Sequence, residues 1–146
     1  MVMRDFIAGL ALAVLVVLPA RAFTVLSYHD VRDTVKGNLD PDRAAISTRH
    51  LVEHFEWLNA HDYRVLSLAD VLAARRSNTP LPEKSVLLTF DDGLASVATR
   101  VLPLLRAYRY PAVVAVVGRW LELAPGESVD YGAQRFTRAD FVSAAQ

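Results

Sequence analysis

Two short, largely apolar runs constrain the fold of this chain more than any other feature of its sequence: Ser85–Phe90 and Ala112–Val117. The first run lacks the alternation of polar and apolar residues that marks a strand with one solvated face. We therefore predict that Ser85–Phe90 is a strand buried on both faces, as in a parallel sheet, and that Ala112–Val117 is a second, fully apolar strand.

Strand and helix patterns alternate along the chain. Further strands are predicted at Phe23–Tyr28 and Tyr63–Leu66, and the polar segment His29–Ile46 is predicted to be a loop. Helices are predicted after four starting signals, which are Ser47 or Thr48, the capping box from Ser67 to Asp70, Gly93 and Thr137. This alternation indicates an α/β fold with a parallel sheet or barrel. Because crossover connections are right-handed, we expect every strand to end at one edge, where the following loops carry the chemistry.

The first predicted helix also carries two histidines. Leu51, Phe55 and Leu58 recur at i, i+4 and i+7, which indicates that one face of this helix is buried. His50 and His54 are spaced i, i+4, a spacing that can bind a metal. Since the apolar residues already define the buried face, we expect the two histidines to lie partly solvated on its flank and not to be ligands.

The first 22 residues resemble a targeting segment more than part of a folded domain. Arg4 precedes the apolar run Phe6–Leu18, and Ala20–Ala22 ends the segment with a small-x-small pattern. The run has 13 residues, whereas a membrane span takes about 20. We therefore expect a cleavable secretory signal at residues 1–22 and an exported chain at residues 23–146, in the periplasm or outside the cell. A buried helix or an uncleaved anchor is the alternative.

Composition excludes several classes of function. The 16 basic and 16 acidic side chains balance, which gives no reason to expect a nucleic acid partner. The chain has no cysteine, so disulfides, thiolate ligands and thiol chemistry are excluded.

The pentapeptide Thr89–Gly93 is the most informative motif. It puts Asp91 and Asp92 directly after the strongest predicted strand. Two adjacent carboxylates repel each other unless a cation or a shared proton offsets their charge, and Gly93 permits a tight turn that would separate the side chains. The alternative is that one of them caps the following helix. His29 follows the first strand, so we expect it at the same edge of the sheet.

These motifs resemble those of a known family. Thr89–Gly93 after an apolar strand looks like the first motif of the polysaccharide deacetylases, the NodB-homology or carbohydrate esterase 4 family. Tyr28–Asp30 resembles the Tyr-His-acid element that opens many of them, and Pro111–Gly118 is similar to their next strand. The wider segments Ser27–Val31 and Val129–Gly132 are most similar to the periplasmic deacetylases of poly-β-1,6-N-acetylglucosamine in biofilm export. The resemblance covers nearly all of the chain after residue 22.

The resemblance implies a distorted (β/α) barrel of the NodB type and a metal-dependent hydrolysis of N-acetyl groups on an exopolysaccharide. By the family pattern Asp91 would be the general base that takes a proton from water, and Asp92 would be a metal ligand. His29 would lie on the substrate side. The implied cofactor is a divalent cation, which is Zn, Co, Ni or Fe. The implied partners are an N-acetylated polysaccharide, such as that of the biofilm matrix, and an outer-membrane export porin.

The chain departs from the family pattern in one respect that matters for activity. Two further metal ligands of the family are histidines that follow the first motif, and this sequence has no histidine after His61. A complete barrel also takes about 250 residues. We therefore expect residues 23–146 to form the first, incomplete part of the barrel and to be inactive alone. Four alternatives stay open: a peptidoglycan deacetylase, a chitin-oligomer deacetylase, a magnesium-dependent phosphohydrolase and a non-catalytic glycan-binding fragment.

Overall fold

The computed structural model describes residues 23–33, 35, 44–131 and 134–143. The predicted secretory signal, residues 1–22, and most of the loop before residue 44 lie outside this description. Within the described ranges, no helix combines the length and the apolar character that crossing a membrane requires.

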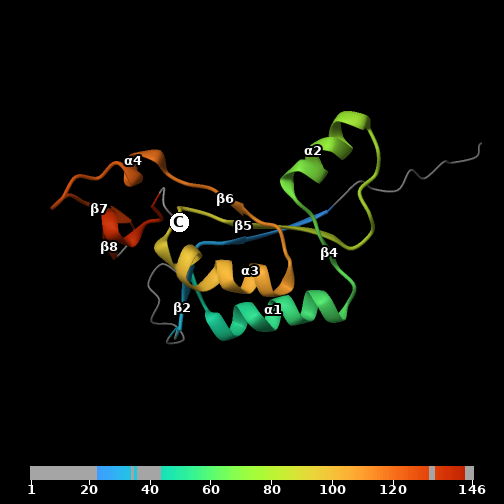
Figure 1. Ribbon diagram of the computed structural model, residues 1–146, viewed down its shortest axis with the longest axis horizontal. Helices are drawn as coiled ribbons and strands as arrows, with labels where there is room; N and C mark the ends of the chain where they lie inside the picture. Colours follow the sequence, from blue (N-terminus) through green and yellow to red (C-terminus); the bar gives the residue numbers. More distant parts are fainter. Residues whose placement is uncertain (1–22, 34, 36–43, 132–133, 144–146) are drawn as a thin grey trace, which may run out of the picture.

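A four-stranded parallel sheet forms the framework of the fold (Figure 1). Its strands are β1 (Thr24–Tyr28), β4 (Arg64–Val65), β5 (Ser85–Phe90) and β6 (Val113–Val114). Strand β1 pairs along one edge of β5, and β4 and β6 pair one after the other along the opposite edge. All of these pairings are parallel, so the predicted α/β fold is confirmed. The order along the sheet differs from the order along the chain, because β5 separates β1 from β4.

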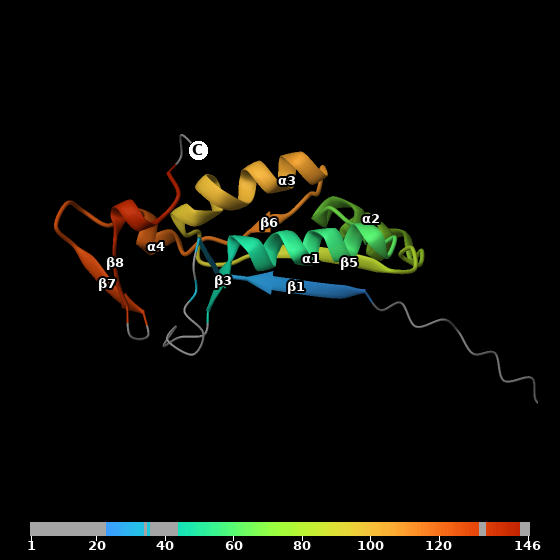
Figure 2. The ribbon, with the colours of Figure 1, turned by 90° about the horizontal axis from the view of Figure 1, so that it is seen from below.

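Helices connect the strands of the sheet. They are α1 (Thr48–Ala60), α2 (Leu68–Ser77), α3 (Leu102–Tyr108) and α4 (Gly118–Leu121). A π-helical turn at Val97–Val101 leads into α3. Helices α1 and α3 lie side by side against the sheet in both views (Figures 1 and 2).

The two predicted helix caps are confirmed. The hydroxyl of Ser47 accepts the backbone N–H of His50 at 3.1 Å and begins α1. Ser67 and Asp70 form a reciprocal capping box at the start of α2, in which each side chain accepts the backbone N–H of the other residue. Both caps depend on groups three residues apart, which is why the local sequence predicts them.

The core lies between the sheet and the helices α1 and α3. Leu51, Phe55 and Leu58 of α1 are buried, as their spacing predicts. They join the alternate residues of β5 and the apolar side of the π-helical turn and α3, namely Val86, Leu88, Phe90, Val97, Val101 and Leu105. Leu87, whose side chain points to the other face of β5, is also buried. The prediction that β5 is buried on both faces is therefore confirmed.

Two further segments contain short strands that the sequence pattern does not predict. In the first, β2 (Asp30–Arg32) and β3 (Ala45–Ser47) form a small parallel pair. In the second, β7 (Ser128–Tyr131) and β8 (Gln134–Thr137) form an antiparallel hairpin. These strands have three or four residues each, too few for a clear periodic pattern in the sequence.

The predicted helix after Thr137 is only one turn long. Thr137 and Asp140 form the expected capping box, but the helix is a 3₁₀ turn that ends at Asp140. Beyond it, Phe141 packs against Trp120 with ring centroids 5.3 Å apart, and Val142 donates its backbone N–H to Gly93. The helix ends here because the residues that follow it make these tertiary contacts instead of continuing the helix.

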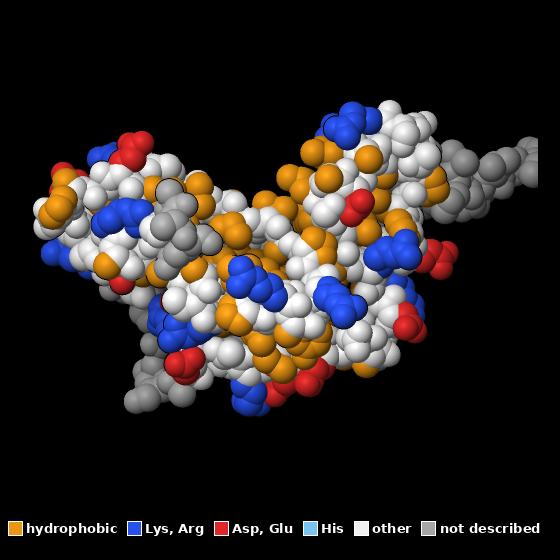
Figure 3. Space-filling model, viewed as in Figure 1, with side chains coloured by type: hydrophobic (Ala, Val, Ile, Leu, Met, Phe, Trp, Pro, Cys, Tyr) orange, Lys and Arg blue, Asp and Glu red, His pale blue; other side chains and the backbone are white. Residues whose placement is uncertain are grey.

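The predicted strand Ala112–Val117 is shorter than expected, since only Val113 and Val114 pair with β5. Val114 is 42% exposed and Val116 is 48% exposed. Figure 3 shows an apolar surface between α2 and the β7–β8 hairpin, the region that β6 crosses in Figure 1. Within the described part of the chain, β6 has no second strand on its outer edge, so its apolar residues are not covered on that side.

Because β5 lies at the centre of the sheet, we predict that a leucine substitution in β5 lowers the free energy of unfolding far more than one in α2. Leu88→Ala removes a fully buried side chain from the core and is expected to cost about 2–5 kcal/mol of unfolding free energy. Leu72→Ala, in the exposed part of α2, is the matched control and should cost less than about 1 kcal/mol. Urea unfolding followed by circular dichroism measures both. Equal losses for the two variants would contradict the described core.

Candidate active site

The loop after β5 makes a sharp turn at the two aspartates. Asp92 has φ +71° and Gly93 has φ +69°, so two consecutive residues lie in the left-handed region. Asp is tolerated there, and Gly is favoured because it has no Cβ. A Cβ on Gly93 would also lie 2.8 Å from Cγ1 of Val116, which is too close. Glycine is therefore required at position 93 for two reasons, backbone conformation and close packing.

The C-terminal part of the described chain is hydrogen-bonded to this turn. The backbone N–H of Val142 donates to the carbonyl of Gly93 at 2.8 Å, and Leu94 forms an isolated antiparallel bridge with Phe141. Phe141 is buried against Trp120 and Phe136. The turn is thus fixed by a segment about fifty residues further along the chain.

Asp91 is held by strand β1. Its backbone N–H donates to the carbonyl of Tyr28 at 2.8 Å, which extends the β1–β5 ladder by one step. Its carboxylate oxygen Oδ2 accepts a hydrogen bond from the hydroxyl of Ser27 at 2.6 Å. Ser27 carries no signal in the sequence, because only the strand register, which pairs Ser27 with Thr89, puts it beside Asp91.

Asp92 lies in a different environment from its neighbour. Its Oδ2 is buried and has no hydrogen-bond partner among the described residues. Burial raises the pKa of Asp92, the charge of Asp91 raises it further, and His29 acts in the opposite direction. A carboxylate that loses water without gaining a hydrogen bond is stabilised most directly by a cation.

His29 lies at the same edge, in the link between β1 and β2. The charge of His29 lowers the pKa of Asp92, so these two predicted residues are near enough to interact electrostatically. The neighbouring Asp30 is already paired, because its carboxylate accepts hydrogen bonds from Ser96 at 2.7 Å and from Arg32 at 2.6 Å. Ser96 also accepts the backbone N–H of Val31. Asp30 therefore fixes the β1–β2 link, and His29 is the residue of that link beside the aspartate pair.

The alternative that one aspartate caps the following helix is not seen. Among the hydrogen bonds of the described residues, Asp91 bonds to β1 and Asp92 leaves one oxygen without a partner. The donor set at Asp92 fits one oxygen ligand to a divalent cation. A catalytic zinc usually has three protein ligands, and the described residues hold no group of three suitable side chains.

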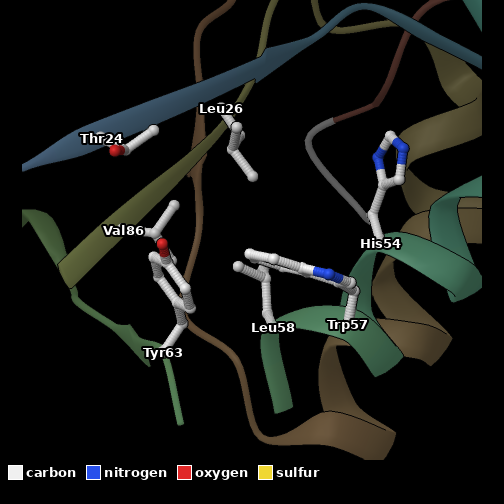
Figure 4. Close-up of a pocket in the computed structure, with 7 residues that line it drawn as sticks. All are labelled: Thr24, Leu26, His54, Trp57, Leu58, Tyr63 and Val86. Carbon is white, nitrogen blue, oxygen red and sulfur yellow. The ribbon is translucent and has the colours of Figure 1, made fainter. Parts of the chain in front are cut away.

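The two histidines of α1 are exposed on the flank of the helix, as expected. His54 bonds through Nδ1 to the hydroxyl of Tyr28 at 3.1 Å, and His50 lies beside Arg49. His54 also lines an apolar pocket of about 240 Å³ between β1 and α1, with the indole of Trp57 along one side (Figure 4). This pocket begins at the amino-terminal ends of the strands, near Thr24, whereas the aspartate pair follows their carboxyl ends.

The burial of Asp92 predicts a pH-dependent effect on stability in the absence of divalent cations. Because the folded protein raises the pKa of Asp92, the folded state favours the protonated acid, and stability falls as the pH rises through this raised value. Asp92→Asn removes that loss, so it should raise the melting temperature at pH 7 by roughly 2–5 °C. The gain should shrink as the pH is lowered and vanish below the ordinary pKa of Asp, where wild-type Asp92 is protonated in both the folded and the unfolded state.

Asp62→Asn is the matched control for this measurement. Asp62 also has a positive φ, of 57°, but its side chain is exposed. It therefore reports the preference of Asn for the left-handed region without the burial of a charge. Thermal unfolding of both variants in EDTA, from pH 3 to pH 8, makes the comparison. If the melting temperature rises equally for both variants, or by an amount that does not vary with pH, the charge of Asp92 does not destabilise the fold.

Comparison with known proteins connects this site to one family. The family model of the polysaccharide deacetylases matches residues 78–136, which include the aspartate pair. The chain is 38% identical to the poly-β-1,6-N-acetyl-D-glucosamine N-deacetylase of Escherichia coli K12 over 125 residues, which are 86% of this chain and 18% of that protein.

Two solved structures are similar over most of the chain. One is a de-N-acetylase from Aggregatibacter actinomycetemcomitans, with a TM-score of 0.73 and 36% identity over 83% of this chain and 47% of that one. The other is the BpsB deacetylase domain from Bordetella bronchiseptica, with a TM-score of 0.66 and 40% identity over 84% and 48%. The chain thus spans about half the length of these solved relatives and about a fifth of the E. coli relative. With the Thr89–Gly93 motif at the end of β5, these matches show that the chain is similar to the polysaccharide deacetylases over most of its length.

Proposed function

We propose that this chain contributes part of the active site of a carbohydrate N-deacetylase. The proposed substrate is an N-acetylated exopolysaccharide, and poly-β-1,6-N-acetylglucosamine of a biofilm matrix is the first choice, because the E. coli relative is named for that polymer. Such a polymer lies outside the cytoplasm, so the proposal includes export of the chain by a signal at residues 1–22. The proposed cofactor is a divalent cation.

The observation that carries this proposal is the difference between two adjacent carboxylates. Asp91 is partly exposed and is oriented by a hydrogen bond to Ser27, so its second oxygen is available to accept a proton. Asp92 is desolvated and has an unpaired buried oxygen. Neighbouring acids in unlike environments are suited to different roles in one reaction.

The roles follow from what amide hydrolysis needs. The oxygen of a water molecule adds to the acetyl carbon, the bond from that carbon to the sugar nitrogen breaks, and acetate and a free amine result. Asp91 would accept the proton of the attacking water, and the leaving nitrogen would take up a proton as its bond to the acetyl carbon breaks. Asp92 would help to hold the divalent cation, whose charge, when bound, polarises the acetyl carbonyl and acidifies the water. His29, at the same edge of the sheet, would face the sugar.

The small number of ligands predicts that residues 1–146 alone are not an active enzyme. Asp92 supplies one oxygen, and the described residues supply no group of three ligands. We expect the purified chain to bind Zn²⁺ or Co²⁺ weakly and to release no acetate from N-acetylglucosamine oligomers. Isothermal titration and a coupled acetate assay test this. Rapid release of acetate that EDTA abolishes would contradict it.

The proposed roles predict opposite behaviour for two nearly isosteric substitutions in the full-length protein encoded by the gene. Asp92→Asn should abolish tight binding of the cation, because the site loses a charged ligand. Asp91→Asn should keep the cation but lower turnover by about 10² to 10⁴, because the water loses its proton acceptor. Metal content per chain and the rate of deacetylation of β-1,6-linked N-acetylglucosamine oligomers are measured for each variant.

Asp30→Asn serves as the control for a neighbouring acid, since Asp30 is already paired with Ser96 and Arg32. It should retain bound cation. Loss of the cation from Asp91→Asn with retention in Asp92→Asn would show that the two roles are exchanged. If the wild-type protein prefers chitin oligomers or peptidoglycan, the chemistry stands and the proposed substrate is wrong.

A further inference from the structure

We propose that Ser27 is a positioning residue for Asp91, holding the carboxylate of the general base in one orientation. This inference rests on the proposed function, because it assigns Ser27 a part in the same reaction. It goes further by naming a residue outside the Thr89–Gly93 motif. Its basis is the 2.6 Å hydrogen bond from the hydroxyl of Ser27 to Oδ2 of Asp91.

The strand register explains why these side chains meet. Ser27 of β1 is paired with Thr89 of β5, and Tyr28 is paired with Phe90. Side chains alternate across a sheet, so Ser27, Thr89 and Asp91 share one face. Tyr28 and Phe90 share the other face, where their rings stack in the core with centroids 5.2 Å apart.

The contact is also supported by the backbone on both sides. Asp91 donates its N–H to Tyr28, the residue after Ser27, at 2.8 Å. Tyr28 is buried, and β1 is paired with β5 along five residues. The distance from Ser27 to Asp91 is therefore set by the sheet and not by the conformation of the loop, although Asp91 itself lies just beyond the strand.

The hydrogen bond has a direct chemical consequence. A hydroxyl that donates to one oxygen of a carboxylate limits rotation of the group and leaves the other oxygen free to accept the water proton. A general base must be within hydrogen-bond reach of the proton that it removes, so a carboxylate that rotates freely is a poorer base. Ser27 is expected to act through Asp91 and not to touch the substrate.

The test uses Ser27→Ala and Ser27→Thr in the full-length protein. Ser27→Ala should lower kcat about 3- to 10-fold with KM, bound cation and melting temperature unchanged, because the side chain is exposed and only the orientation of Asp91 is lost. Ser27→Thr keeps a hydroxyl on the same carbon and should restore most of the rate. Ser77→Ala is the control, since that hydroxyl bonds only within and just after α2, and its rate should be unchanged.

A double-mutant cycle separates positioning from a general structural effect. In the Asp91→Asn background, Ser27→Ala should cause no further loss, because the residue that it orients is already disabled. An unchanged kcat for Ser27→Ala, or the same loss in both backgrounds, would overturn the inference while the proposed function stands. No deacetylation by the wild-type full-length protein would overturn the proposed function, and the role of Ser27 with it.

Discussion

Strand β5 is paired along both edges and buried along most of its length, and the other described elements are arranged around it. Its side chains at alternate positions fill the core beneath α1 and α3. A strand held in this way has little freedom at its carboxyl end. The turn that begins at Asp91 therefore starts from a fixed point, and the chemistry proposed for this chain depends on that rigidity.

The two aspartates after β5 lie in different environments, which suits them to different roles. They are adjacent in sequence, but the left-handed backbone at Asp92 turns the second side chain away from the first. Asp91 keeps a hydrogen bond and partial access to solvent, while Asp92 is buried and has one oxygen without a partner among the residues that the structure describes. Burying a charge in this manner is costly in a protein without a cation. A buried carboxylate that destabilises the fold, at the edge of a parallel sheet where ligands bind, is typical of a binding or catalytic site.

The end of the described chain contributes to this site although it carries none of the proposed chemistry. Val142 bonds to the carbonyl of Gly93, and Val116 packs so closely on Gly93 that only glycine fits. Val114 of β6 and Val116 just after it remain exposed. The aspartate turn is thus enclosed from one side by described residues, and the solved relatives are about twice as long as the region that matches this chain.

The sequence by itself determined the features that depend on neighbouring residues. The limits of β5, the caps at Ser47 and Ser67, and the buried face of α1 follow from patterns of three to seven residues, and the structure has all of them. The presence of Asp91 and Asp92 after a buried strand is also a local pattern, and it was enough to indicate the family.

Tertiary structure alone decided the features that join distant segments. The order of β1, β5 and β4, the hydrogen bond from Ser27 to Asp91 and the electrostatic interaction of His29 with Asp92 join residues about twenty to sixty-five positions apart. The exposure of Val114 and the short final helix were likewise set by what packs nearby. The physical reason is that pairing and burial depend on which surfaces meet in space, whereas capping and periodicity depend on a few adjacent residues.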